Sequence, residues 1–138
     1  MQVNIHNLAG HSKVKQRNED FKRILSDLQI FNKTEIFGNS ENAPIDNFDI
    51  IFMMGDMNYR IDSEYEYIID CINNNKICEL TPYDQLLLEI EEGYTELVRF
   101  SEGTIEFPPT YKYIPGSHNY YYDGEKIPGW CDRILYSY

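Results

Sequence analysis

An apolar run over residues 48–54 leads directly into the polar sequence GDMNYR at residues 55–60, and this junction constrains the fold more than any other stretch. The run contains a single aspartate and predicts a buried strand over residues 49–54. The glycine that follows allows a sharp turn or a close backbone approach. Asp56 and Asn58 are two residues apart and would share one face of an extended chain. The strand therefore brings a carboxylate, a carboxamide and a guanidinium to one point.

Hydrophobic periodicity predicts further elements on both sides of this strand. We expect strands at residues 2–5 and 130–136, extended segments between 97 and 107, and helices at 13–28, 63–73 and from 81 to near 93. Ser63 heads a capping box, and Thr81 before a proline is typical of a helix start. The polar residues 31–47 predict a connection. Strands that alternate with helices indicate a single α+β (α/β sandwich) domain over residues 1–138.

Composition limits the classes of partner. The net charge of −11 argues against binding nucleic acid or an anionic membrane through the whole surface, although a local basic pocket is compatible with it. If the substrate is phosphorylated, cations scattered on an acidic background must bind it: Arg60, Lys112, Lys126, Arg133 and Arg17. No apolar stretch is long enough to span a membrane and no basic-plus-apolar leader is present, so we expect a cytoplasmic protein.

The cysteines and histidines give no sign of a disulfide framework or a metal site. Cys71, Cys78 and Cys131 are odd in number and form no CxxC pair. The three histidines make no metal-ligand spacing with them. We therefore expect free thiols and nominate no metal ligand.

Two groups of polar residues have both a chemical and a structural interpretation. Asp56 could accept a proton from water while Asn58 holds a phosphoryl oxygen, but Gly-Asp-x-Asn is also good turn chemistry, and spacing alone favours the turn. His6, just past a strand end, could donate to a phosphate, whereas a lone loop histidine is more often an ordinary surface residue. The sequence leaves these alternatives open.

The C-terminal third poses the same choice. Lys112 between two tyrosines fits either a phosphate grip or an edge strand with one packed face. Asp132 and Arg133 enter an apolar strand, where buried charges need a partner or a function. The structural alternative for this pair is an ion pair that ties the strand ends together.

Taken in order, several stretches resemble one family. They are VNIH at residues 3–6, QRNEDF at 16–21, GDMNYRI at 55–61, DQL at 84–86, FSEGTIEFPPTYKY at 100–113, YD at 122–123 and PGWCDRIL at 128–135. Together they resemble the inositol polyphosphate 5-phosphatases of the DNase I-like endonuclease/exonuclease/phosphatase superfamily. Within the matched stretches, Asn7 replaces the family's leucine, and the segment between Tyr122 and Trp130 is short, which bears on the assignment of Lys126.

The resemblance implies roles for individual residues. Asp56 would orient or deprotonate the attacking water, Asn58 and His6 would contact the scissile phosphate, and Asp132 would orient a catalytic histidine. Contacts to the neighbouring 4-phosphate would come from Tyr111, Lys112 and Lys126. The reaction would be Mg²⁺-dependent hydrolysis of the 5-phosphate.

The resemblance also defines the partners. The substrate would be a phosphoinositide lipid or a soluble inositol polyphosphate, and a lipid substrate implies peripheral contact at the cytosolic membrane face. No protein partner is predicted, and the net charge and the Tyr-Lys-Tyr context disfavour a nucleic-acid substrate.

The family's magnesium-ligating glutamate and its Ser-Asp-His histidine have no match in this chain. We therefore expect a partial domain, the C-terminal half of the catalytic domain. Its fold would be part of the four-layered DNase I-like fold, roughly one half of the β-sandwich with flanking helices, with an apolar face exposed. The alternative function is a catalytically inactive chain that at most binds phosphoinositides.

Overall fold

The computed structural model describes residues 1–35, 48–94 and 96–138, with the backbone alone for 29–35. Its strands are β1 (Gln2–His6), β2 (Ile51–Asp56), β3 (Ser101–Glu102) and β4 (Asp132–Ser137), in the sheet order β1-β2-β4-β3. β1 runs parallel to β2, and β4 is antiparallel to both β2 and β3. The helices are α1 (Val14–Glu35), α2 (Tyr65–Asn73) and α3 (Gln85–Glu91), with 3-10 turns η2 (Ile77–Glu79) and η3 (Thr81–Tyr83).

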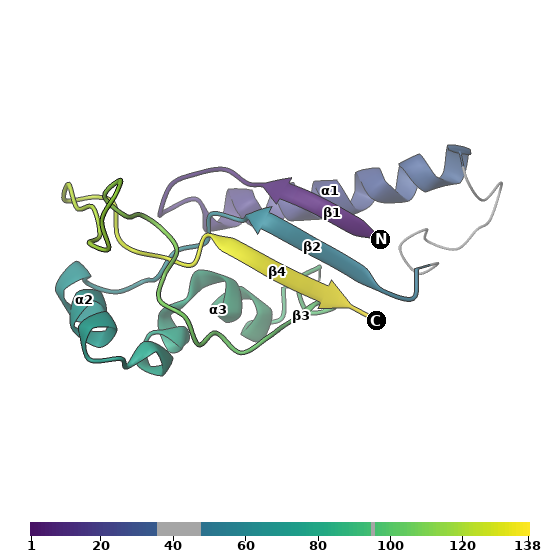
Figure 1. Ribbon diagram of the computed structural model, residues 1–138. Helices are drawn as coiled ribbons and strands as arrows, with labels where there is room; N and C mark the ends of the chain where they lie inside the picture. The colour runs from purple at the N-terminus through teal and green to yellow at the C-terminus, as the bar shows by residue number, and fades with distance from the viewer. Residues whose placement is uncertain (36–47, 95) are drawn as a thin grey trace.

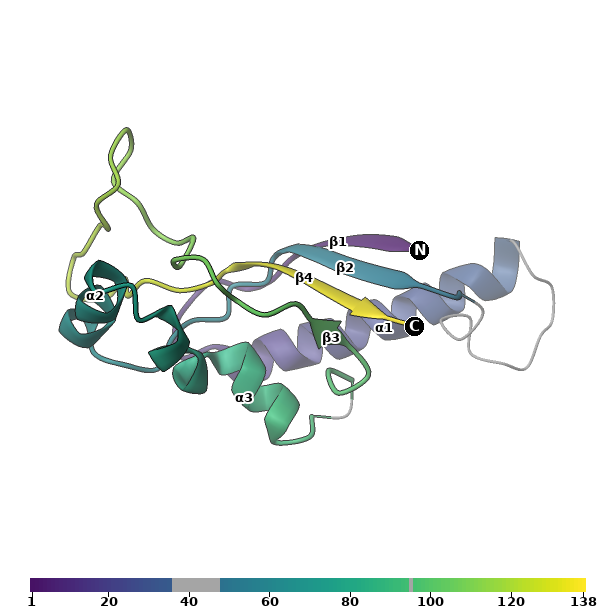
Figure 2. The same cartoon turned by 60° about the horizontal axis from the view of Figure 1, so that its bottom comes forward.

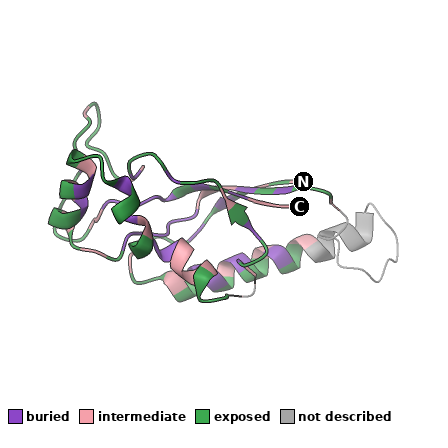
Figure 3. Ribbon diagram, turned by 90° about the horizontal axis from the view of Figure 1, so that it is seen from below, coloured by how far each residue is buried: buried purple, intermediate pink, exposed green. Residues whose placement is uncertain are grey.

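α1 and α3 lie on one side of the sheet, and α2 lies beyond the end of the strands (Figure 1). Figure 2 shows α1 and α3 beneath the strands, and Figure 3 shows the same layers with buried residues in both the strands and the helices. Val3 and Ile5 of β1, Ile51 and Met53 of β2 and Leu135 of β4 point to this side, because alternate residues of a strand face opposite ways. The α+β fold expected from the sequence is confirmed.

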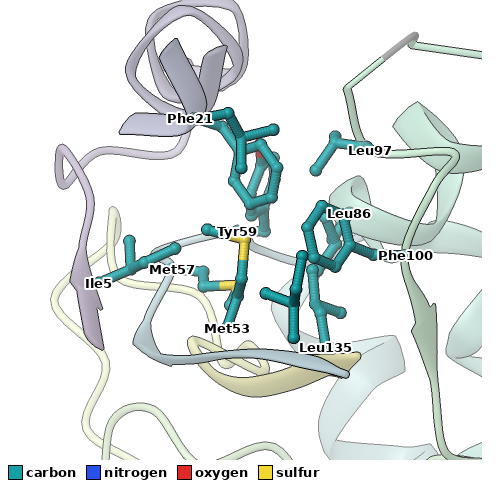
Figure 4. Close-up of a cluster of buried hydrophobic side chains, with 11 residues drawn as sticks. Ile5, Phe21, Met53, Met57, Tyr59, Leu86, Leu97, Phe100 and Leu135 are labelled. Atoms are coloured by element: carbon teal, nitrogen blue, oxygen red, sulfur yellow. The ribbon is translucent and has the colours of Figure 1, made fainter. Parts of the chain in front are cut away.

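The main core fills the space between sheet and helices (Figure 4). Phe21 of α1 meets Phe100 edge-to-face with ring centroids 5.6 Å apart. Tyr59, fully buried, packs into the same cluster immediately after the GDMN sequence. The residues that follow β2 are thus held in place by the core, which restricts the neighbouring polar side chains of Asp56 and Asn58.

The opposite face of the sheet is uncovered in the part of the chain that the structure describes. Phe52 on β2 and Ile134 on β4 are 42% and 57% exposed there, and Met54 lies beside them. This apolar exposed face is the one expected for half of a β-sandwich.

Several predicted boundaries are wrong. The first helix continues to Glu35, so the predicted connection at 31–47 begins as helix, and its remainder, 36–47, lies outside the described residues. α2 starts after Glu64 without a side-chain cap, so Ser63 caps nothing. The predicted extended residues near 97–107 form a strand only at Ser101–Glu102, where β4 supplies hydrogen-bonding partners.

The start of the third helix is also different from the prediction. Thr81 lies in η3, and Asp84 is the N-cap of α3, its Oδ1 accepting from the Leu87 N–H at 3.0 Å. A negatively charged cap satisfies an otherwise unpaired N–H and interacts favourably with the positive end of the helix dipole. Thr81 followed by a proline and Asp84 both fitted the sequence rule for a helix start. Only the tertiary partner of Asp84, described below, distinguishes these two positions.

Candidate active site

Three nominated side chains lie in one row across the sheet. His6 at the end of β1 pairs in register with Asp56 on β2, which pairs with Asp132 at the start of β4. His6 Nε2 lies 3.9 Å from Asp56 Oδ2. Asp132 accepts a hydrogen bond from the Thr110 hydroxyl at 2.8 Å. Strand pairing therefore brings together residues that are far apart in the sequence.

Gly55 is what allows β1 and β2 to approach so closely beside this row. Its φ is +131°, and a Cβ at this position would lie 2.2 Å from the Ile5 carbonyl oxygen. Every other residue would clash with the β1 backbone there. The close backbone approach expected of this glycine is made to the neighbouring strand.

A turn follows directly. The Asn58 N–H donates to Asp56 Oδ1 at 3.0 Å, and Asn58 has a φ of +56°, which asparagine tolerates better than most residues. The turn that the spacing favoured is therefore present. The same turn buries the Asn58 carboxamide, whose Nδ2 donates to the Asn7 carbonyl at 2.9 Å. Turn and site are one structure here.

Arg60 fixes the other side of that carboxamide. Its guanidinium donates to Asn58 Oδ1 at 2.6 Å and to the Asn58 carbonyl at 3.2 Å. The guanidinium carbon also lies 4.0 Å from the centroid of the Tyr111 ring, a stacked cation–π contact. Arg60 is buried and couples Asn58 to Tyr111.

Sequence reasoning gave no role to Gln85, which connects the site to the helices. Its Oε1 accepts from the Arg17 guanidinium at 2.7 Å and from the Arg60 N–H at 3.0 Å, and its Nε2 donates to Asp62 at 2.7 Å and to the His11 carbonyl at 3.1 Å. Burial lowers the pKa of Arg17. Only the DQL match pointed to Gln85, since its partners come from distant segments.

A cavity of about 580 Å³ adjoins this network, within the usual range for small-ligand sites. Three of the residues nominated for substrate binding, Arg60, Tyr111 and Lys126, line it. His11, which the sequence left without a role, lies in the same wall with its Nε2 2.7 Å from Asp62 Oδ1.

The two nominated lysines meet at one aromatic ring. Lys112 Nζ and Lys126 Nζ lie 5.3 Å and 5.4 Å from the Tyr121 ring centroid. Lys112 is outside the cavity lining. Lys126 is paired with Asp123, and its hydrogen bond lowers the pKa of that carboxyl to about 2. An anion in the cavity would therefore compete with Asp123 for Lys126.

Arg133 has a structural role as the cation of a buried ion cluster. Its guanidinium is fully buried, 2.9 Å from Asp84 Oδ1 and 2.7 Å from Glu102 Oε1. The ion-pair alternative is confirmed for Arg133, although its partners are Asp84 and Glu102 and not the adjacent Asp132. Burial raises the pKa of Asp84, against the opposing effect of the guanidinium. This cluster ties β4 to β3 and to the start of α3.

The described residues contain neither a cluster of metal ligands nor a membrane-spanning helix. No three side chains among histidine, cysteine, aspartate and glutamate come together in a group that could hold a metal ion. None of the helices in residues 1–35, 48–94 and 96–138 is long and apolar enough to cross a bilayer. Cys71, Cys78 and Cys131 are free thiols, as predicted, and burial raises the pKa of Cys131 to about 12.

Sequence comparison matches residues 1–138 to endonuclease/exonuclease/phosphatase family 2. The chain is 37% identical over 142 residues to phosphatidylinositol 3,4,5-trisphosphate 5-phosphatase 2A of Danio rerio, a match that covers 97% of this chain and 11% of the relative. It is 39% identical over 132 residues to synaptojanin-2 of Rattus norvegicus, covering 95% and 8%.

Structure comparison agrees. The fold matches the inositol polyphosphate 5-phosphatase domain of a synaptojanin, solved with inositol (1,4)-bisphosphate and a calcium ion, at a TM-score of 0.80 and 35% identity. The match covers 97% of this chain and 37% of that domain. A Cimex nitrophorin matches at a TM-score of 0.59 and 28% identity over 72% of this chain and 32% of that one, so related folds carry different functions.

Proposed function

The chain belongs to endonuclease/exonuclease/phosphatase family 2, among the inositol polyphosphate 5-phosphatases, and from this premise we propose that its site serves to remove a 5-phosphate from an inositol headgroup. The observation that carries the proposal is the row of His6, Asp56 and Asp132 across one end of the strands, beside the Asn58 turn. The chain spans 8% to 11% of the length of the two curated relatives, so the activity is proposed for this chain and not transferred from them.

The chemistry follows from the groups in that row. Asp56 Oδ1 is occupied by the Asn58 N–H, and its side chain is 35% exposed, so Oδ2 can accept the proton of an attacking water. The water oxygen bonds to phosphorus as the bond from phosphorus to the ring oxygen breaks, and the released ring oxygen takes up a proton from solvent. Asn58 Nδ2 has a second N–H for a phosphoryl oxygen, and His6 can donate to another.

The adjoining cavity would hold the rest of the headgroup. Tyr111 and Lys126 in its wall offer a phenol and an ammonium to a phosphate of the inositol ring. Lys112 lies outside the cavity, and its ammonium and that of Lys126 both contact the aromatic ring of Tyr121. The substrate would be a soluble inositol polyphosphate or the headgroup of a lipid at the cytosolic membrane face. In this scheme Arg60 acts mainly by holding Asn58.

Magnesium, expected from the family, is a separate question. The described residues provide no cluster of three ligands, so they do not by themselves fit a metal site. We therefore assign no step to a metal ion. Binding without turnover is the alternative function, since the family's glutamate and Ser-Asp-His histidine have no counterpart in this sequence.

Phosphate release tests the proposal directly. The purified chain is incubated with inositol 1,4,5-trisphosphate, with and without Mg²⁺, and with inositol 1,4-bisphosphate as the substrate that lacks a 5-phosphate. We expect release from the first compound alone. Asp56→Asn should lower the rate by about 10²–10⁴, the usual contribution of a general base.

The matched control is Asp27→Asn, which removes the same charge from the exposed surface of α1 and should leave the rate unchanged. If no phosphate is released under any condition while the trisphosphate still binds, and binding weakens in Lys126→Gln, the alternative of binding without turnover is correct. Equal release from both compounds would contradict the assignment of the 5-phosphate.

A further inference from the structure

An aromatic arm, residues 110–122, projects from the end of the molecule next to α2. Its yellow-green loop extends away from the helices and the sheet in two views (Figures 1 and 2). It contains five of the chain's 12 tyrosines, at positions 111, 113, 120, 121 and 122. The base of the arm adjoins the cavity, because Tyr111 lines it.

The arm is held in one shape by its own contacts. The Tyr121 N–H donates to the Lys112 carbonyl at 2.8 Å, and the Ile114 N–H donates to the Asn119 carbonyl at 2.9 Å. Tyr113 and Tyr120 stack with centroids 4.5 Å apart, and their hydroxyls lie 2.8 Å from one another. A pre-shaped loop loses little conformational entropy when it binds.

The tip and flank of the arm expose apolar and aromatic groups. Ile114, where the turn at the end of the arm begins, is 42% exposed, and Tyr122 on the flank is 45% exposed. Tyr121 and Tyr113 add further exposed ring surface. Tyrosine is enriched where proteins meet the bilayer interface, since its ring is apolar and its hydroxyl is polar.

Charge distinguishes the arm from the rest of the chain. Residues 110–122 contain no aspartate or glutamate and include Lys112 and His118, whereas the whole chain carries −11. An anionic surface would therefore repel most of the molecule and accept this end. The same charge pattern would orient the arm toward an anionic surface.

We propose that the aromatic arm docks on the surface of an anionic lipid bilayer, with Ile114 at the contact and the cavity beside it. The inference rests on the proposed function in that it selects a lipid headgroup over a free inositol phosphate as the substrate. Docking itself needs no hydrolysis, so it is measured apart from catalysis.

Vesicle sedimentation tests the proposal. The full chain is mixed with vesicles of phosphatidylcholine alone, or of phosphatidylcholine with phosphatidylserine, neither of which contains a phosphoinositide. We expect binding to the serine-containing vesicles that falls as salt is raised. Ile114→Glu should weaken it about tenfold, because a carboxylate replaces an apolar group at an anionic interface.

Val98→Glu is the matched control. Val98 is a β-branched residue, 49% exposed and outside the arm, so both variants carry the same added charge. Equal weakening in the two variants would overturn the proposal. So would wild-type binding to the serine-containing vesicles that is no stronger than binding to vesicles of phosphatidylcholine alone. Phosphate release from soluble inositol 1,4,5-trisphosphate, assayed on the same preparations, shows separately whether the proposed function holds.

Discussion

Replacing Arg133 by methionine tests the buried ion cluster. The Arg133 and Asp84 side chains are both fully buried, and the Glu102 side chain is 10% exposed. Methionine replaces the aliphatic part of the arginine side chain but carries no charge, so it leaves two carboxyl groups without their cation. Asp84 would keep the Leu87 N–H as a partner, but lose both guanidinium contacts at 2.9 and 3.0 Å.

The expected loss is large compared with total stability. Removing one partner of a buried pair typically costs about 3–5 kcal/mol, because the remaining charge stays desolvated. Domains of this size have unfolding free energies of about 5–15 kcal/mol. Arg133→Met should therefore remove between about a fifth and all of the total stability.

The loss should also depend on pH. Burial already raises the pKa of Asp84 from its ordinary 3.8, and the guanidinium opposes that rise. Without Arg133 the folded-state pKa rises further, while the unfolded value stays near 3.8. Between these two pKa values the folded variant binds more protons than the unfolded chain, so its stability falls as the pH rises from the unfolded pKa through the folded one.

Urea unfolding followed by circular dichroism, at about pH 5 and about pH 7.5, measures both effects. Arg23→Met is the control, because Arg23 is 71% exposed and its 3.4 Å pair with Asp20 should be worth about 0–1 kcal/mol. If Arg133→Met fails to fold at the higher pH, adding Asp84→Asn should partly restore folding. A loss no larger than that of Arg23→Met, or one independent of pH, would refute the reasoning.

Three further substitutions test the site. Asn7 is buried, and neither its Nδ2 nor its Oδ1 has a partner among the described residues, so Asn7→Leu should raise the unfolding free energy by about 1–3 kcal/mol in urea titrations. Gly55→Ala should lower it by at least about 2 kcal/mol, since its Cβ would meet the Ile5 carbonyl at 2.2 Å. Arg60→Gln should lower kcat about tenfold with little change in KM, because Arg60 orients Asn58. Arg60→Lys should restore little of the lost kcat, since lysine lacks the planar guanidinium. A rise in KM alone would indicate that Arg60 binds the substrate directly.

The elements were predictable where the pattern was local and strong. The strand before Gly55 and the helix that begins near residue 14 follow from apolar periodicity, which depends on the nearest neighbours alone. The capping prediction failed at Thr81 because Asp84 fitted the rule as well, and it failed at Ser63 because α2 starts after Glu64 with no side-chain cap. At α3, the helix start falls at Asp84, whose partner Arg133 lies 49 residues away.

The sequence by itself determined that a strand leads directly into Gly55, Asp56 and Asn58, and that the chain belongs to the 5-phosphatases. Only the tertiary structure decided that His6 and Asp132 stand in register with Asp56, and that Gln85 and Arg60 hold the turn. The physical reason is range. Strand propensity and turn chemistry are properties of a few adjacent residues, whereas register and buried hydrogen bonds depend on segments that meet only after the chain has packed.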